Sequence, residues 1–282
     1  MDELLFVDST FEKDNTSRYK LSIQLCLDGF SFSILCSKNK CLALFQSKRI
    51  ASENENNSIE ALKNSVRNCE YLNLSYAKVS VLWLTKKASL IPSEFFSEDL
   101  AIDSFQLCHP LLKDEIIRWD ELKVMNSYLV YSIPSALPEF IESQFAGAKI
   151  SHQNIHFYQR ALKELIDIKH PKVYIQIYDN FFDAFIPGNN QKHVANSFSY
   201  KEETDMVYYI LNIYKQLKLN TAYSQLFLSG KIDHVSKSYQ ILKRYIKVIT
   251  IEGISNEIIR NDRISNSEYN QFTQLLNTSL CE

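Results

Sequence analysis

The chain has 282 residues, 45% of them hydrophobic and 12% aromatic, enough for one large domain or two of ordinary size. Its 31 basic and 33 acidic residues form no basic stripe, which argues against nucleic-acid binding, because clustered cations must meet the phosphates. No apolar run could span a bilayer, and the first residues lack a signal-peptide pattern. The six cysteines are scattered without a CxxC pair, which is typical of reduced thiols. We therefore expect a cytoplasmic protein.

The first predicted unit is a three-stranded meander. Residues 20–27 alternate apolar and polar side chains, which is strand periodicity. Asp28-Gly29 then predicts a tight hairpin turn, since both residue types tolerate a positive φ. A return strand through 30–36 and a third strand at 41–45 complete the meander. An amphipathic helix over 59–69 and a buried strand over 79–84 follow.

The middle of the chain predicts further helices and strands. Residues 128–133 have a strand pattern, and a helix opens after Pro134 and ends at Gly147. A short extended segment at 148–151 leads into a helix over 155–168, which ends before a proline.

The last third repeats the first in order. We predict strands at 173–178, 181–186 and 193–198, then a helix over 207–217 and a strand over 225–228. The remaining predicted elements are a helix near 238–245, a strand at 246–251 and a final helix near 267–280.

Two segments of the sequence recur in pattern. Residues 21–45 return at 173–197, an offset of 152, and residues 72–84 return at 217–229, an offset of 145. The two segments recur in the same order, and the smaller second offset means that a few residues are missing between them in the second copy. This is typical of a duplicated folding unit. We therefore predict two halves, 1–168 and 169–282, with the C-terminal helix packing back on the first half.

Four stretches carry a resemblance to a known family: LSIQLCLDGFSFSIL, LNLSYAKVSV, NSFSYKEETDMVYYIL and LFLSGKI. Over residues 19–250 the chain resembles an uncharacterised bacterial family assigned the actin-like ATPase fold. The resemblance implies an α/β protein of two duplicated ribonuclease-H-like halves that face each other across a nucleotide cleft. In each half we expect a mixed sheet with a three-stranded meander plus helices. More distantly, the layout is similar to the pilus-assembly protein PilM and the cell-division protein FtsA, which bind ATP and hold partners at the inner membrane.

The resemblance also locates the expected phosphate loops. Members that hydrolyse ATP carry Asp-x-Gly at the end of the first strand of each half, where glycine admits the phosphates and aspartate holds the metal. Here Gln176 and Tyr178 take these two positions, and the offset of 152 gives Gln24 and Cys26 in the first half. A glutamine cannot replace a carboxylate at a Mg²⁺ site, and a tyrosine ring occupies phosphate space. We therefore predict degenerate phosphate loops without ATP hydrolysis.

Five residues support an alternative in which ATP with Mg²⁺ still binds in the cleft: Asp28, Gly29, Asp179, Asp183 and Gly230. Asp28-Gly29 looks like a degenerate phosphate loop, although its spacing favours a hairpin turn. Asp179 and Asp183 flank the equivalent hairpin and could meet Asp28 across a cleft, or be a solvated turn and an edge charge. Gly230 falls where the superfold packs paired glycines under adenosine, and a turn at a strand end explains it equally well.

Other constellations are weaker. His152 and His156 have the i, i+4 spacing of metal ligands on a helix, but no HExxH or nearby cysteine accompanies them, and the pattern starts a helix between them. We therefore predict no metal site. Phe95 and Phe96 cannot both face one core on a regular strand, so one of them is a candidate interface anchor.

The preferred hypothesis is a non-catalytic protein of the actin-like fold, a pseudo-ATPase that serves as a scaffold for a protein partner. The sequence does not identify that partner. The alternative is an ATP-binding protein that uses the interdomain cleft with weak or no hydrolysis. Ribonuclease-H-like nuclease chemistry would need clustered carboxylates at the central strands, where this chain has Gln24 and Gln176.

Overall fold

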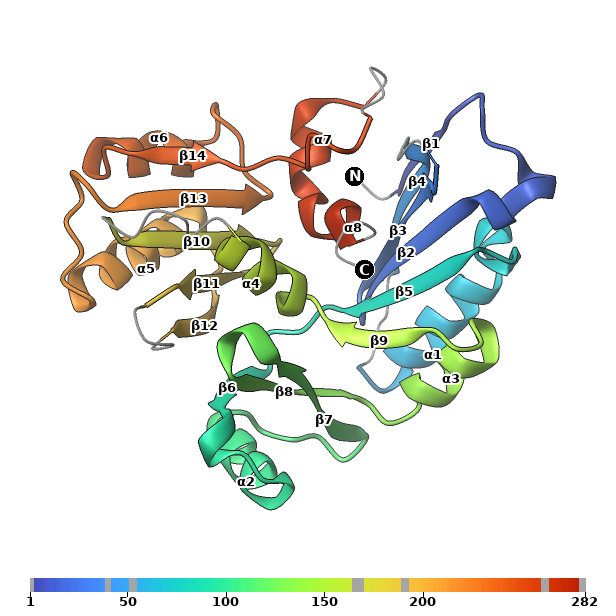
Figure 1. Cartoon of the computed structure of the whole chain (residues 1–282), viewed down its shortest axis with the longest axis horizontal. Helices are drawn as coiled ribbons and strands as arrows, with labels where there is room; N and C mark the ends of the chain where they lie inside the picture. The colour runs from blue at the N-terminus through green and yellow to red at the C-terminus, as the bar shows by residue number, and fades with distance from the viewer. Residues whose placement is uncertain are drawn as a thin grey trace.

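Six strands form the sheet of the first half, in the order β1-β4-β3-β2-β5-β9 (Figure 1). β2, β3 and β4 are an antiparallel meander, and β5 and β9 extend the sheet in parallel to β2. The strands are β1 (Glu3–Val7), β2 (Tyr19–Cys26), β3 (Gly29–Cys36), β4 (Leu42–Arg49), β5 (Lys78–Trp83) and β9 (Lys149–His152). The computed structural model describes residues 3–38, 42–50, 55–163, 170–188, 193–259 and 264–278.

Three helices accompany this sheet: α1 (Glu55–Arg67), α3 (Leu137–Gln144) and α4 (Asn154–Lys163). α1 buries Leu62 and Val66 against the sheet, as its apolar spacing predicts. Short 3₁₀ turns connect the elements: η1 (Lys13–Arg18), η2 (Glu70–Asn73), η3 (Ser93–Phe95) and η4 (Lys123–Met125).

The second half contains a five-stranded sheet in the order β12-β11-β10-β13-β14. Its strands are β10 (Lys172–Ile177), β11 (Phe181–Ile186), β12 (Val194–Ser199), β13 (Gln225–Gly230) and β14 (Ile249–Ile251). α5 (Glu203–Gln216) and α6 (Lys237–Tyr245) pack on one another, and their apolar faces share one core with the sheet.

The sheet order confirms the predicted duplication. β4-β3-β2-β5-β9 corresponds strand for strand to β12-β11-β10-β13-β14. Gln24 pairs with Ser31, and Gln176 pairs with Asp183, so the offset of 152 holds across the meander. The offset of 145 for the later strand is wrong: Gln24 pairs with Leu82, whereas Gln176 pairs with Ser229, which gives 229 − 82 = 147. The predicted offset was two residues too small. Because side chains alternate with a period of two, it still matched residues that point to the same face of the sheet.

The first hairpin turn differs by one residue from its prediction. Cys26 pairs with Gly29, so Leu27 and Asp28 are the turn residues and Gly29 begins β3. Neither turn residue has a positive φ. Glycine is required at 29 for another reason: a Cβ there would lie 2.4 Å from the carbonyl oxygen of Lys48 on β4. The close approach of β4 therefore selects glycine at the start of β3.

Between β5 and α3 along the chain, a separate three-stranded sheet forms in the order β6-β8-β7, with α2 on its outer side (Figure 1). Its elements are β6 (Ala88–Pro92), α2 (Glu98–Cys108), β7 (Glu115–Leu122) and β8 (Ser127–Pro134). We call these four elements the insert. Of its strands, the sequence predicted only β8, because β6 and β7 are partly exposed and alternate imperfectly.

The chain ends in two short helices, α7 (Asn266–Gln271) and α8 (Thr273–Thr278), where the sequence predicted one helix over 267–280. Residues 279 and 280 of that helix lie outside the described residues, as does the predicted boundary between the halves at 168. α7 and α8 share a core with the first sheet, whose members are Phe6, Leu35, Leu42, Phe45, Ile254, Ile258, Tyr269, Leu275 and Leu276. None of the described helices is long and apolar enough to cross a membrane.

Candidate functional site

The tips of the two equivalent hairpins, β2–β3 and β10–β11, lie near one another. Arg49, at the end of β4, forms an ion pair with Asp179 at the tip of the second hairpin. Burial raises the pKa of the Cys26 thiol well above its usual value. The charges of Asp28 and Asp179, which both lie near this thiol, raise it further. This junction between the halves is where the fold implied by the sequence would hold nucleotide phosphates.

The residues at the Asp-x-Gly positions are engaged with their own neighbours. The Gln176 side chain is buried, and its Oε1 accepts a hydrogen bond from Ser229 Oγ at 2.7 Å. Cys26 Sγ donates to the carbonyl of Gly29 at 3.2 Å. The Tyr178 ring stacks on Phe181 with 4.5 Å between centroids. These three side chains place an amide where the hydrolytic members have a carboxylate, and a thiol and a phenol where they have glycines.

The three candidate aspartates have different surroundings. Asp28 is exposed in the hairpin turn. Asp179 is held by Lys231 and Arg49; burial opposes its ionisation, but these two cations outweigh burial and lower its pKa. Asp183 is buried and accepts hydrogen bonds from Ser197 Oγ and from Gln153 Nε2, the latter at 3.2 Å. Within the described residues, no three His, Cys, Asp or Glu side chains are arranged to hold a metal.

Asp183 titrates above the usual range of aspartate. Burial raises its pKa to about 6, against the opposing effect of its hydrogen bonds from Ser197 and Gln153. The folded protein therefore holds this proton more tightly than the unfolded chain, in which an aspartate titrates near pH 4. Ionising Asp183 destabilises the fold, so its contribution to stability falls as the pH rises from about 4 to about 6 and is constant above.

This pKa predicts a pH-dependent difference between the protein and its Asp183→Asn variant. Between pH 4.5 and 7.5 the free energy of unfolding of the wild type should fall relative to that of the variant by on the order of 2 kcal/mol. Urea unfolding of both proteins at the two pH values measures this difference. Parallel pH profiles would mean that Asp183 is ionised without penalty and is accessible to water.

Gly230 has a structural explanation. It has a φ of +91°, and a Cβ at this position would lie 2.1 Å from the carbonyl oxygen of Ile177 on the neighbouring strand. The parallel pairing of β13 with β10 therefore requires glycine at this position, with or without an adenosine nearby.

The two histidines with the i, i+4 spacing, for which no metal role was predicted, lie on different elements. His152 ends β9, whereas α4 begins at Asn154 and carries His156. His152 is fully buried, and burial lowers its pKa to about 3. Its Nδ1 accepts from the backbone amide of Asn154 at 3.1 Å, so its Nε2–H donates to the Thr85 carbonyl, also at 3.1 Å. Both ring nitrogens are therefore used within the fold.

The space between the two sheets contains α8; the sequence predicted a helix over these residues but not its position between the halves. α8 packs against β2 and β3 of the first sheet, against β13 of the second and against α4. All six of its residues are buried, including the polar side chains Thr273, Gln274, Asn277 and Thr278. Gln274 lies beside the Tyr178 hydroxyl, at one of the degenerate phosphate positions.

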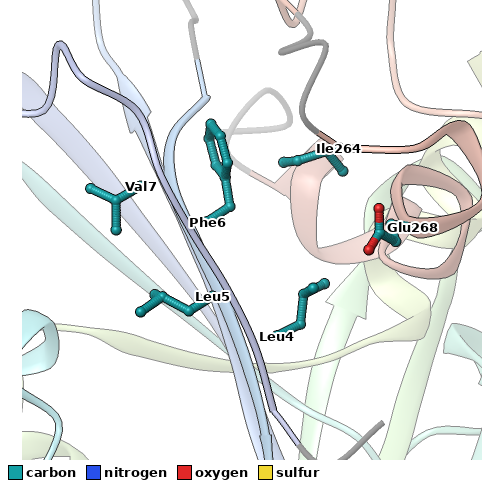
Figure 2. Close-up of a pocket in the computed structure, with 6 residues that line it drawn as sticks. All are labelled: Leu4, Leu5, Phe6, Val7, Ile264 and Glu268. Carbon is teal, nitrogen blue, oxygen red and sulfur yellow. The ribbon is translucent and has the colours of Figure 1, made fainter.

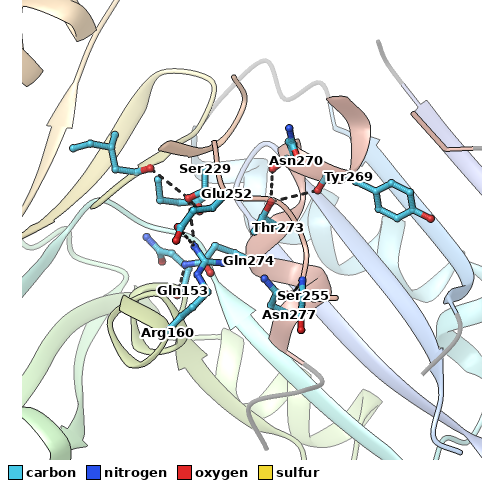
Figure 3. A network of polar contacts seen from close by, with 12 residues as sticks. Gln153, Arg160, Ser229, Glu252, Ser255, Tyr269, Asn270, Thr273, Gln274 and Asn277 are labelled. Atoms are coloured by element: carbon cyan, nitrogen blue, oxygen red, sulfur yellow. Dashed lines mark hydrogen bonds and ion pairs between the residues drawn. The ribbon is translucent and has the colours of Figure 1, made fainter. Parts of the chain in front are cut away.

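Figure 3 shows the polar contacts that hold α8 in place. Gln274 Nε2 donates to the carbonyl of Gln153 at 3.4 Å, and Asn277 Oδ1 accepts from the amide of Ser255 at 2.8 Å. Close by, Arg160 of α4 contacts Glu252 and Ser229 of the second half, each at 3.4 Å. All of these contacts join different segments of the chain, and that between Gln274 and Gln153 spans 121 residues, so no local sequence pattern could have indicated them.

Two surface grooves lie away from this junction. One, of about 320 Å³, runs along β1 at the outer edge of the first sheet and is closed on the other side by Ile264 and Glu268 (Figure 2). The other, of about 230 Å³, lies between β12 and α5. Neither is lined by a residue that the sequence singled out as a candidate for nucleotide binding.

Two duplicated halves with this strand order, facing each other at their first hairpins, define a protein of the actin-like ATPase fold. The chain belongs to the DUF3822 family, described as "Protein of unknown function (DUF3822)", whose family model matches residues 8–249. Both the predicted fold and the predicted family are therefore confirmed.

Solved structures agree. A Bacteroides thetaiotaomicron protein with an actin-like ATPase fold and unknown function is 26% identical, with a TM-score of 0.74 over 86% of this chain and 94% of that one. The PilM-PilN type IV pilus biogenesis complex contains a chain that is 10% identical, with a TM-score of 0.56 over 93% of this chain and 98% of that one. A search of curated proteins found no match.

Proposed function

We propose that this protein is a pseudo-ATPase, a non-catalytic member of the actin-like fold that binds a protein partner. The observation that carries the proposal is the burial of α8 between the two sheets, with Gln274 beside Tyr178. A nucleotide bound at the hairpin tips would have to displace this helix together with the apolar core that it shares with the first sheet.

The residues at the junction do not fit ATP with Mg²⁺. A magnesium ion requires oxygen ligands in a nearly octahedral arrangement, usually including one or two carboxylates. Gln24 and Gln176 lack that charge, and Asp179 is already engaged in ion pairs with Arg49 and Lys231. These observations favour the non-catalytic proposal over the ATP-binding alternative.

A protein-binding role agrees with the presence of a fold neighbour in a PilM-PilN complex, although that likeness concerns the fold alone. In such a role the duplicated halves are a rigid platform, and the partner binds their outer surface instead of the space between them. We include a cytoplasmic location in the proposal, because the sequence pattern favours reduced cysteines.

Calorimetric titration of the purified protein with ATP and Mg²⁺ tests the proposal. We expect no saturable heat at millimolar nucleotide, because binding would have to offset the loss of the packed helix. A 1:1 binding isotherm with a Kd tighter than about 1 mM, equivalent to roughly 4 kcal/mol of binding free energy, would overturn it. The Arg49→Ala, Lys231→Ala double variant is the control, since any residual anion binding at the hairpins should disappear in it.

A further inference from the structure

Within the insert, α2 packs one face against the three-stranded sheet. Ala101 and Phe105 are buried against Ile91 and Val130 of the three-stranded sheet. The helix begins at an N-cap, where Ser97 Oγ accepts from the amide of Leu100 at 3.3 Å. α2 is therefore a well-anchored helix, and it lies at the far end of the insert from both large sheets (Figure 1).

The opposite face of α2 exposes large apolar side chains. Leu100 is 54% exposed and Leu107 is 88% exposed, and seven residues are nearly two turns of helix, so both lie on the same side. Phe95, in the 3₁₀ turn just before α2, is 63% exposed. Its neighbour Phe96 instead stacks on Tyr128, with centroids 3.7 Å apart. Of the two candidate anchors, Phe95 is thus the one that reaches the surface.

The same surface is acidic. From residue 88 to residue 112 the charged side chains are Glu94, Glu98, Asp99 and Asp103, with no Lys or Arg among them. All four are exposed, and in the described part of the chain none of them forms an ion pair. Lys87, the basic residue that precedes this stretch, is paired with Glu115 at 2.8 Å.

Apolar side chains ringed by unpaired charges of one sign are a recognition surface for a partner of the opposite sign. Grouped exposed apolar side chains mark interaction sites on folded proteins, and complementary charge steers and orients the partner. An anionic membrane would be repelled by the four carboxylates. A helix that places leucines in contact with Leu100 and Leu107, and lysines or arginines beside Asp99 and Asp103, satisfies both features.

We propose that the outer face of α2 and the adjoining Phe95 bind a basic amphipathic segment of a partner protein. The inference deepens the proposed protein-binding function and rests on it. The apolar contact is small, so we expect binding in the micromolar range that depends on ionic strength.

The test uses a fluorescent synthetic peptide of leucine and lysine in helical repeat, and fluorescence anisotropy as the readout. We expect the Leu100→Gln, Leu107→Gln variant to bind this peptide at least tenfold more weakly than the wild type. The matched control is Val235→Gln, which changes a side chain that is 85% exposed on the second half and should leave binding unchanged. A leucine–glutamate peptide of the same repeat should not bind. Melting temperatures should be equal throughout, because every altered residue is exposed.

Three results would overturn the inference. Equal affinity of the α2 variant and the wild type for the basic peptide would show that the peptide binds elsewhere. Equal binding of the acidic peptide would refute the role of charge. Self-association of the wild type in sedimentation experiments, lost in the α2 variant, would make a second copy the occupant. ATP binding, by contrast, would overturn the pseudo-ATPase proposal while leaving the peptide result intact.

Discussion

Substitution of Leu275 by alanine should lower the free energy of unfolding by about 3 kcal/mol. Leu275 lies in α8, is fully buried and belongs to the core that α8 shares with the first sheet. Truncating a buried leucine removes apolar contacts and leaves a cavity, with a loss in the range of roughly 2–5 kcal/mol. Urea unfolding with unchanged m-value measures the difference.

The control for this experiment is the same change at a surface leucine. Leu107→Ala removes a side chain that is 88% exposed and should alter stability by less than about 0.5 kcal/mol. If Leu275→Ala proved as mild as Leu107→Ala, α8 would not be packed between the sheets, and the argument against a nucleotide at that place would lose its basis.

Substitution of Gly230 by alanine should lower stability by more than about 3 kcal/mol. Two effects add: a non-glycine residue at a φ of +91° is strained by roughly 1–2 kcal/mol, and the new Cβ would lie 2.1 Å from the Ile177 carbonyl oxygen. Because this oxygen belongs to the backbone of β10, relieving the clash would disturb the β10–β13 pairing.

Gly147→Ala separates the two effects. Gly147 also has a positive φ, of +75°, but a Cβ there would meet nothing within 4 Å. We expect this variant to lose only about 1 kcal/mol, the strain alone. Equal losses at Gly147 and Gly230 in urea unfolding would contradict the close approach at Gly230 and reopen the question of why glycine occurs there.

The sequence was informative where structure depends on local pattern. Alternation over 20–27 and 173–178 located β2 and β10, the first strand of each meander, and repetition of the pattern indicated the duplication. The hairpin at Asp28 was displaced by one residue, because Gly29 is selected by the approach of Lys48 from a third strand and not by the turn. Such a contact between strands leaves no trace in the two residues of the turn.

The content of the space between the halves could not be predicted. The α8 sequence TQLLNT has four polar residues in six and resembles a surface helix. Gln274 and Asn277 are buried with hydrogen-bonding partners outside the helix, the Gln153 carbonyl and the Ser255 amide, whereas Thr273 and Thr278 donate to backbone carbonyls of the preceding turn. The aligned copies nevertheless identified Gln24, Cys26, Gln176 and Tyr178 as the positions to examine, and Tyr178 is where α8 meets the second hairpin.

Amide hydrogen exchange of α8, with and without millimolar ATP and Mg²⁺, tests the central claim most directly. If residues 273–278 are a permanent part of the space between the halves, their amides should exchange slowly, and ATP should not change their rates. Fast exchange that ATP accelerates further, together with new protection at the hairpin tips around Asp28 and Asp179, would contradict the account. That result would mean that the helix leaves and a nucleotide takes its place.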